Sequence, residues 1–129
     1  MSQFRLPDYL EHMRQAATDA CMFVEGLGKA DFLEDKRTQQ AVIMSLVVIG
    51  EAATKVMDGH ADFTQAHADI PWHSIRGMRN RIAHGYFQIN LDVVWETVQN
   101  ALPQLSVQLT TVLEDLTQKS ANNKANPPQ

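Results

Sequence analysis

The segment from Ala41 to Ala53 constrains the fold more than any other part of the chain, because it is apolar on most of its helical circumference. A helix of this kind must be covered by other elements of a protein. Its most continuous part, Ala41–Gly50, is far shorter than the ~20 apolar residues that a membrane-spanning helix needs. The pattern therefore predicts a central, buried helix that begins near Phe32–Asp35 and ends near Met57.

Other segments predict helices that surround this centre. Pro71 can open one of them and Gly85 can close it. Asn90 is a plausible N-cap for the last helix, which Pro103 should kink or split. No segment has the period of two residues that is typical of a strand. We therefore predict an all-α, up-and-down bundle of four main helices. Besides the central helix, the expected helical segments are Asp8–Leu27, a short turn at Asp62–His67, Trp72–His84, and Leu91 to about Thr117.

The length of 129 residues suits one compact domain, which we place at residues 1–119. The tail, residues 120–129, reads S-A-N-N-K-A-N-P-P-Q, has almost nothing to bury and is predicted to be disordered. No apolar segment follows a basic start, so no signal peptide is expected. The single cysteine, Cys21, cannot form an internal disulfide and lies in an apolar helical run, as a small core residue would. We expect a cytoplasmic protein.

Positive charge is concentrated in one part of an acidic chain. The formal net charge is −4, which argues against broad binding of nucleic acid. The segment from Pro71 to Asn90 nevertheless contains three arginines and two histidines and no acidic residue. Guanidinium groups bind phosphate and imidazole transfers protons near neutral pH, so this segment suits a site that handles a few phosphates.

The helix expected at Trp72–His84 has two faces. An apolar face of Ile75, Met78 and Ile82 should contact the core, and the opposite face carries the stripe His73, Arg76, Asn80 and His84. Arg79 lies between these faces, roughly 140° around the helix from His84. The two could meet if His84 swings at the end of the helix, or if a second protomer supplies its own pair across a two-fold axis. We favour the dimer.

A basic helix end also forms without any function, because cations near a helix C-terminus are stabilised by the helix dipole. Arg79 and His84 are separated by four residues, and many helices match that spacing by chance. Spacing alone therefore leaves a solvated basic face as an open interpretation.

The sequence R-N-R-I-A-H-G-Y at Arg79–Tyr86 resembles the motif of HEPN domains, and its extension through Gly85 and Tyr86 is similar to the HepT branch. HepT proteins are toxins that are paired with a minimal nucleotidyltransferase (MNT) antitoxin. Three further segments resemble the same family: I-G-E-A-A at Ile49–Ala53, I-P-W-x-x-I-R-G-M-R-N-R at Ile70–Arg81, and L-D-V-V-W-E-T-V at Leu91–Val98.

The resemblance implies a metal-independent endoribonuclease that acts as a homodimer, within a type VII-like toxin–antitoxin module. His84 would be the general acid/base, and Arg79 would bind phosphate and stabilise charge. Asn80 would help to orient them, with Arg76 and His73 as further phosphate-binding residues. RNA carries its own nucleophile, the 2′-hydroxyl, so a base and a cation suffice for cleavage to a 2′,3′-cyclic phosphate.

By the same resemblance, Tyr86 would be the residue that the antitoxin modifies with AMP, which adds negative charge and bulk beside His84. A tyrosine at a helix end can also be an ordinary amphipathic residue. Glu51 needs a partner and either pairs with Arg76 or Arg79 or lies at a helix edge.

The remaining expectations concern ligands and alternative functions. His60, His67 and His73 have no metal-ligand spacing, and we expect no metal and no cofactor. Trp72 and Trp95 are expected to pack in the core rather than stack on bases. RNA, a second protomer and the antitoxin are the expected partners, without DNA or a membrane. The alternatives are a non-catalytic nucleotide- or substrate-binding partner subunit of a minimal nucleotidyltransferase, and a purely structural dimerising bundle.

Overall fold

The computed structural model describes residues 5–125, with the side chains of residues 5–121. Within this part of the chain every regular element is helical, which confirms the all-α prediction. The elements are α1 (Leu6–Phe23), α2 (Lys29–Glu34), α3 (Lys36–Gly59), α4 (Ala61–Ala66), α5 (Trp72–His84), η1 (Tyr86–Gln88), α6 (Leu91–Glu96), η2 (Thr97–Ala101) and α7 (Leu102–Ala125).

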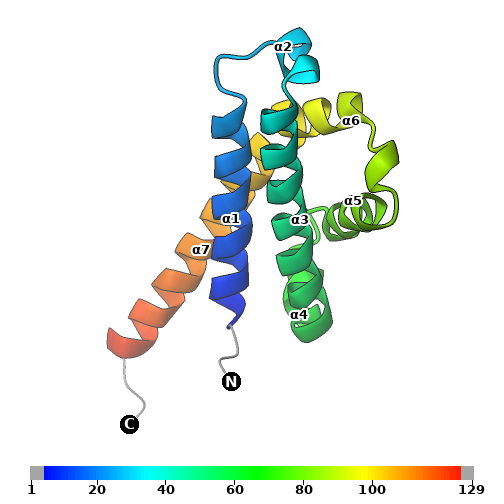
Figure 1. The fold of residues 1–129 in the computed structure, drawn as a ribbon. Helices are drawn as coiled ribbons and strands as arrows, with labels where there is room; N and C mark the ends of the chain where they lie inside the picture. The colour runs from blue at the N-terminus through cyan, green and yellow to red at the C-terminus, as the bar shows by residue number, and fades with distance from the viewer. Residues whose placement is uncertain (1–4, 126–129) are drawn as a thin grey trace.

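Helix α3 lies at the centre of the bundle, as its all-round apolar character predicts. Figure 1 shows α1 and α3 side by side, α7 crossing behind α1, and α5 at the other side of α3, and α3 contacts both α1 and α5. The long helices therefore share one core. Its fully buried side chains include Leu10, Met13, Val42, Ile49, Val56, Val94, Val98 and Leu109.

Local sequence signals explain where α5 begins and ends and where α6 begins. Helix α5 begins directly after Pro71 and ends before Gly85, as predicted. The Asn90 side chain accepts hydrogen bonds from the backbone N–H groups of Asp92, at 3.0 Å, and Val93, at 3.3 Å, and so caps α6. The chain after α5 is thereby held in a short connection between two fixed helix ends.

Two predicted helices are divided in the structure. The expected start of the central helix, near Phe32–Asp35, spans a break: α3 begins at Lys36, directly after Asp35, whereas Phe32 lies in the separate helix α2. The extended backbone of Asp35 interrupts the helix, and its side chain caps α3 through Thr38 N at 3.1 Å. The last helix is divided by the π-helical segment η2 just before Pro103, which lacks the N–H that a regular helix needs there. The second division confirms the predicted effect of Pro103.

Both ends of the predicted helical region are shifted. Helix α1 ends at Phe23 rather than Leu27, and Gly26 in the following turn has a φ of +82°, which helices do not allow. Helix α7 continues to Ala125, although disorder is predicted from Ser120. No proline occurs in this helix after Pro103, so the backbone hydrogen bonds can continue one residue at a time. Residues 126–129 of the predicted tail lie outside the described residues.

Helix α3 has 24 residues, and by length and composition it could cross a membrane. Core helices of water-exposed bundles meet the same criterion, and half of the apolar window of α3 is buried against the rest of the chain. The contacts of α3 with α1 and α5 are those of a core helix.

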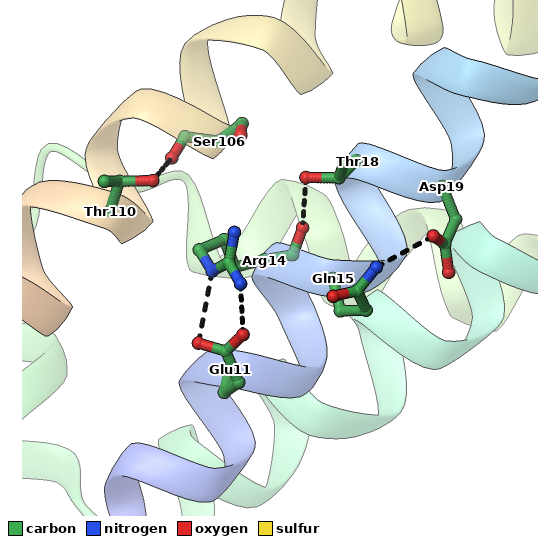
Figure 2. A network of polar contacts seen from close by, with 7 residues as sticks. All are labelled: Glu11, Arg14, Gln15, Thr18, Asp19, Ser106 and Thr110. Carbon is green, nitrogen blue, oxygen red and sulfur yellow. Dashed lines mark hydrogen bonds and ion pairs between the residues drawn. The ribbon is translucent and has the colours of Figure 1, made fainter.

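Several polar contacts on α1 and α7 are local to one helix. Figure 2 shows that the Arg14 guanidinium binds the Glu11 carboxylate within α1, and that the Thr110 hydroxyl donates to the Ser106 carbonyl within α7. The Arg14 guanidinium lowers the pKa of the Glu11 carboxyl. These contacts join residues three or four positions apart on one helix, so they support the helices without linking them.

Candidate functional site

Arg79 links α5 to the central helix. Its Nη2 donates a hydrogen bond to Thr54 Oγ1 at 3.1 Å, and its Nε lies 3.1 Å from Glu51 Oε1. The contact with Glu51 is an ion pair without hydrogen-bond alignment, since the buried Nε has no hydrogen-bond partner in the described chain. The arginine side chain is 22% exposed, so it is held on α3 and still reaches the surface.

Thr54 is well oriented for this contact. Its hydroxyl donates to the carbonyl of Gly50 at 2.8 Å, which leaves an oxygen lone pair for Arg79 Nη2. The hydroxyl therefore joins the backbone of α3 to the guanidinium. Sequence reasoning did not identify Thr54 as part of the site.

Gly50 makes the close approach of α5 possible. A Cβ atom at Gly50 would lie 2.3 Å from the Cβ of Arg79 and 2.8 Å from its Cγ, distances that no packed structure accepts. Glycine inside a helix costs about 1 kcal/mol relative to alanine, so a glycine in this apolar helix indicates a packing constraint. This glycine could therefore have predicted a close helix contact from the sequence, but the prediction above did not include Gly50.

The structure decides which of two arginines, Arg76 or Arg79, pairs with Glu51. Glu51 pairs with Arg79, whereas Arg76 Nη1 lies 3.8 Å from Asp58 Oδ1. Asp58 is largely exposed, and exposed pairs of this length contribute little to stability. Arg76 is therefore weakly held and its guanidinium can turn toward a ligand.

The predicted polar stripe of α5 faces away from the core. His73, Asn80 and His84 are exposed, whereas Ile82 on the opposite face is buried. Among residues 5–121, whose side chains the structure describes, neither the Asn80 nor the His84 side chain forms a hydrogen bond or ion pair, and none joins His84 to Arg79. The protomer thus presents an anchored guanidinium and a free imidazole from different sides of one helix.

Tyr86 and Phe87 follow α5 on the short helix η1. The backbone N–H of Gln88 donates to the carbonyl of Gly85 at 2.8 Å, and this bond closes the turn. Tyr86 is 48% exposed, and its ring meets Phe87 edge to face with centroids 6.0 Å apart. The phenol is therefore accessible beside the C-terminal end of α5.

The two tryptophans have the predicted packing roles. Trp72 is buried and its Nε1 donates to the carbonyl of His67 at 3.0 Å. Trp95 is buried against Phe32, with ring centroids 5.3 Å apart.

Cys21 is also partly buried, with Sγ 3.9 Å from the carbonyl oxygen of Val98, and burial raises the pKa of its thiol.

A family profile and several known proteins match most of this chain. A family profile described as "Ribonuclease HepT-like" matches residues 13–112. A "Probable ribonuclease HepT" of Thermococcus cleftensis is 39% identical over 98 residues, which cover 76% of this chain and 86% of that protein. No solved structure matches the chain.

Two further relatives carry similar names. A "Putative RNase" of Caldanaerobacter subterraneus is 34% identical over 106 residues, 82% of this chain and 92% of that protein. Another "Putative RNase", from Methanocaldococcus jannaschii, is 33% identical over 118 residues, 92% of each chain. These names support a nuclease activity in general. The matched residues 13–112 include the α3 residues that contact Arg79, as well as Arg79, His84 and Tyr86 themselves, and the chain belongs to the HepT-like ribonuclease family.

Proposed function

We propose that this protein is the toxin component of a toxin–antitoxin module and that it is a metal-independent endoribonuclease. The single observation that carries the proposal is the pairing of an anchored guanidinium, Arg79, with an unpaired imidazole, His84, on one helix. A fixed cation can stabilise charge as it develops on a phosphate, and a free imidazole can transfer protons.

The proposed reaction uses the 2′-hydroxyl of RNA as its nucleophile. His84 accepts the 2′-hydroxyl proton while that oxygen attacks the adjacent phosphorus. The bond from phosphorus to the 5′-oxygen of the next nucleotide breaks, this oxygen takes up a proton from solvent, and the protonated His84 returns its proton to solvent. The products are a 2′,3′-cyclic phosphate and a free 5′-hydroxyl. Arg79 stabilises the additional negative charge on the phosphate oxygens, with Arg76, His73 and Asn80 as further contacts to the RNA.

The separation of Arg79 and His84 supports a homodimer as the active form. The two residues lie roughly 140° apart around α5 and do not touch within one protomer. A two-fold axis beside α5 brings the arginine of one protomer toward the histidine of the other, with the same relation repeated at the second site. Each site of the proposed dimer then contains residues of both protomers.

Tyr86 is the proposed point of control. A cognate MNT-domain nucleotidyltransferase would transfer AMP to it: the phenol oxygen attacks the α-phosphate of ATP, pyrophosphate leaves, and the phenol proton passes to solvent. The exposure of Tyr86 supports access for such an enzyme. The added phosphate places negative charge two residues from His84 and repels the RNA backbone. A protein with these proposed partners would act in the cytoplasm.

The test is cleavage of defined RNAs by the purified protein in the presence of a chelator. We expect fragments that end in a 2′,3′-cyclic phosphate, and no cleavage at a position that carries a single 2′-deoxyribose. Full-rate cleavage of the deoxy substrate would contradict the mechanism. RNA or nucleotide binding without any cleavage would instead identify a non-catalytic partner subunit.

A further inference from the structure

The aromatic ring of Phe87 has no packing role within the described chain. Its side chain is 99% exposed, whereas Phe23, also on the surface, is 44% exposed and Phe32 is fully buried. Among the described residues, the one ring contact of Phe87 is the edge-to-face contact with Tyr86. A fully exposed phenylalanine gives no burial energy to this fold, so its ring is available to a ligand.

The backbone holds this ring at a defined place beside the site. Gly85 ends α5, the bond from Gln88 N to Gly85 O closes η1, and the Asn90 cap fixes the start of α6. Phe87 follows His84 by three residues, which span at most about 10 Å. That distance corresponds to a few stacked nucleotides, at about 3.4 Å each.

The surroundings of the ring favour a polyanion over an apolar partner. Arg81, His84 and Gln88 are exposed and lie within six residues of Phe87 in the chain, and no acidic residue occurs from Pro71 to Asn90. An aromatic ring among cationic and polar side chains is the composition of a surface that binds unpaired nucleic acid, where bases stack on rings and cations hold the backbone. A protein-binding surface is expected to have a contiguous apolar core instead.

We propose that Phe87 is the base-stacking contact of this site, and that its ring packs on an unpaired RNA base next to the phosphate that Arg79 and His84 act on. The inference rests on the proposed function and deepens it. Stacking holds the ribose beside His84 and therefore selects where along the strand the phosphate is placed. Since the base must leave its own stack, RNA that is unpaired at this position is the required substrate.

The first experiment separates stacking from simple hydrophobicity. Phe87→Leu keeps an apolar side chain without an aromatic face, and Phe87→Tyr keeps the ring. With a labelled single-stranded RNA pool of randomised sequence, we expect Phe87→Leu to raise KM by about 5- to 150-fold with little change in kcat. Phe87→Tyr should behave as the wild type, and so should the control Val107→Ala, which alters an exposed apolar residue on α7.

A second experiment detects the contact directly. Trp72 and Trp95 are buried, so the indole introduced by Phe87→Trp can be observed as the exposed fluorophore. We expect its emission to be quenched by the RNA pool with 2′-O-methyl riboses, which is not cleaved. Heparin, a polyanion without bases, should leave the emission nearly unchanged.

The outcomes separate this inference from the proposed function. Equal KM for the wild type and Phe87→Leu overturns the stacking role, as does equal quenching by heparin. Unchanged KM with loss of the dimer or of antitoxin neutralisation assigns Phe87 to a protein interface and also overturns it. If the wild type cleaves no RNA while the RNA pool still quenches the indole, the nuclease proposal fails and the stacking contact stands.

Discussion

Gly50 and Arg79 are packed so closely that a methyl group on Gly50 would lie 2.3 Å from the Cβ of Arg79. This contact sets how near α5 lies to α3, and it brings the guanidinium to Thr54 and Glu51. The position of the proposed phosphate-binding group therefore depends on the absence of a side chain on the neighbouring helix.

Gly50→Ala should displace α5 and lower both stability and activity. Overpacking at such a contact costs about 1–3 kcal/mol, and a shift of Arg79 should reduce kcat further. Gly59→Ala is the matched control, because a Cβ at Gly59 on the same helix meets nothing within 4 Å. Thermal unfolding and RNA cleavage measure the two effects. Equal behaviour of the two variants would contradict the packing argument.

Thr54→Val should impair catalysis more than stability. The substitution removes the acceptor of Arg79 Nη2 and keeps the shape of the side chain. A hydrogen bond to a charged group contributes about 1.5–3 kcal/mol, so we expect kcat/KM to fall about tenfold or more, with recovery in Thr54→Ser. Thr110→Val removes a hydroxyl on α7 that makes the same kind of backbone hydrogen bond and, among the described residues, accepts none from an arginine; it should leave kcat/KM unchanged.

Mixing two inactive variants tests whether the sites are shared between protomers. Arg79→Gln and His84→Ala should each abolish cleavage while remaining folded by circular dichroism. After unfolding and refolding together, an equimolar mixture should regain about one quarter of the wild-type activity, because half of the dimers are mixed and each has one intact site. No recovery, with mixed dimers demonstrated by mass, would show that the sites are not shared.

Tyr86→Phe should separate toxicity from its control. The phenylalanine ring keeps the shape of the residue but offers no hydroxyl for AMP transfer. We expect growth arrest on induction that a co-expressed cognate antitoxin no longer relieves, and no mass increase on incubation with antitoxin and ATP. Normal neutralisation of this variant would count against Tyr86 as the modified residue.

The Cys21 thiol should react slowly with alkylating reagents in the folded protein. Burial raises its pKa, so a smaller fraction is thiolate at any given pH. The rate of iodoacetamide labelling should therefore rise at a higher pH than it does for the same protein in denaturant. If the labelling rate of the folded protein rises at the same pH as in denaturant, or at a lower pH, the thiol is more accessible than its contact with Val98 indicates.

The local pattern of the sequence determined much of the site helix. Proline and glycine set the bounds of α5, Asn90 capped the next helix, and Pro103 interrupted the last one, because each effect depends on the backbone chemistry of a few adjacent residues. The same periodicity predicted that His73, Asn80 and His84 face solvent. Apolar periodicity could not place the break at Asp35, because residues 35–40 carry no apolar side chain.

Only the tertiary structure decided what Arg79 contacts. Its partners Glu51 and Thr54 lie more than twenty residues earlier in the chain, and the choice between Arg79 and Arg76 for Glu51 depends on how α5 is placed along α3. Helical periodicity gives the direction of a side chain around its own axis, but not the distance or offset between two helices. Here that offset follows from close packing at Gly50, which depends on both helices together.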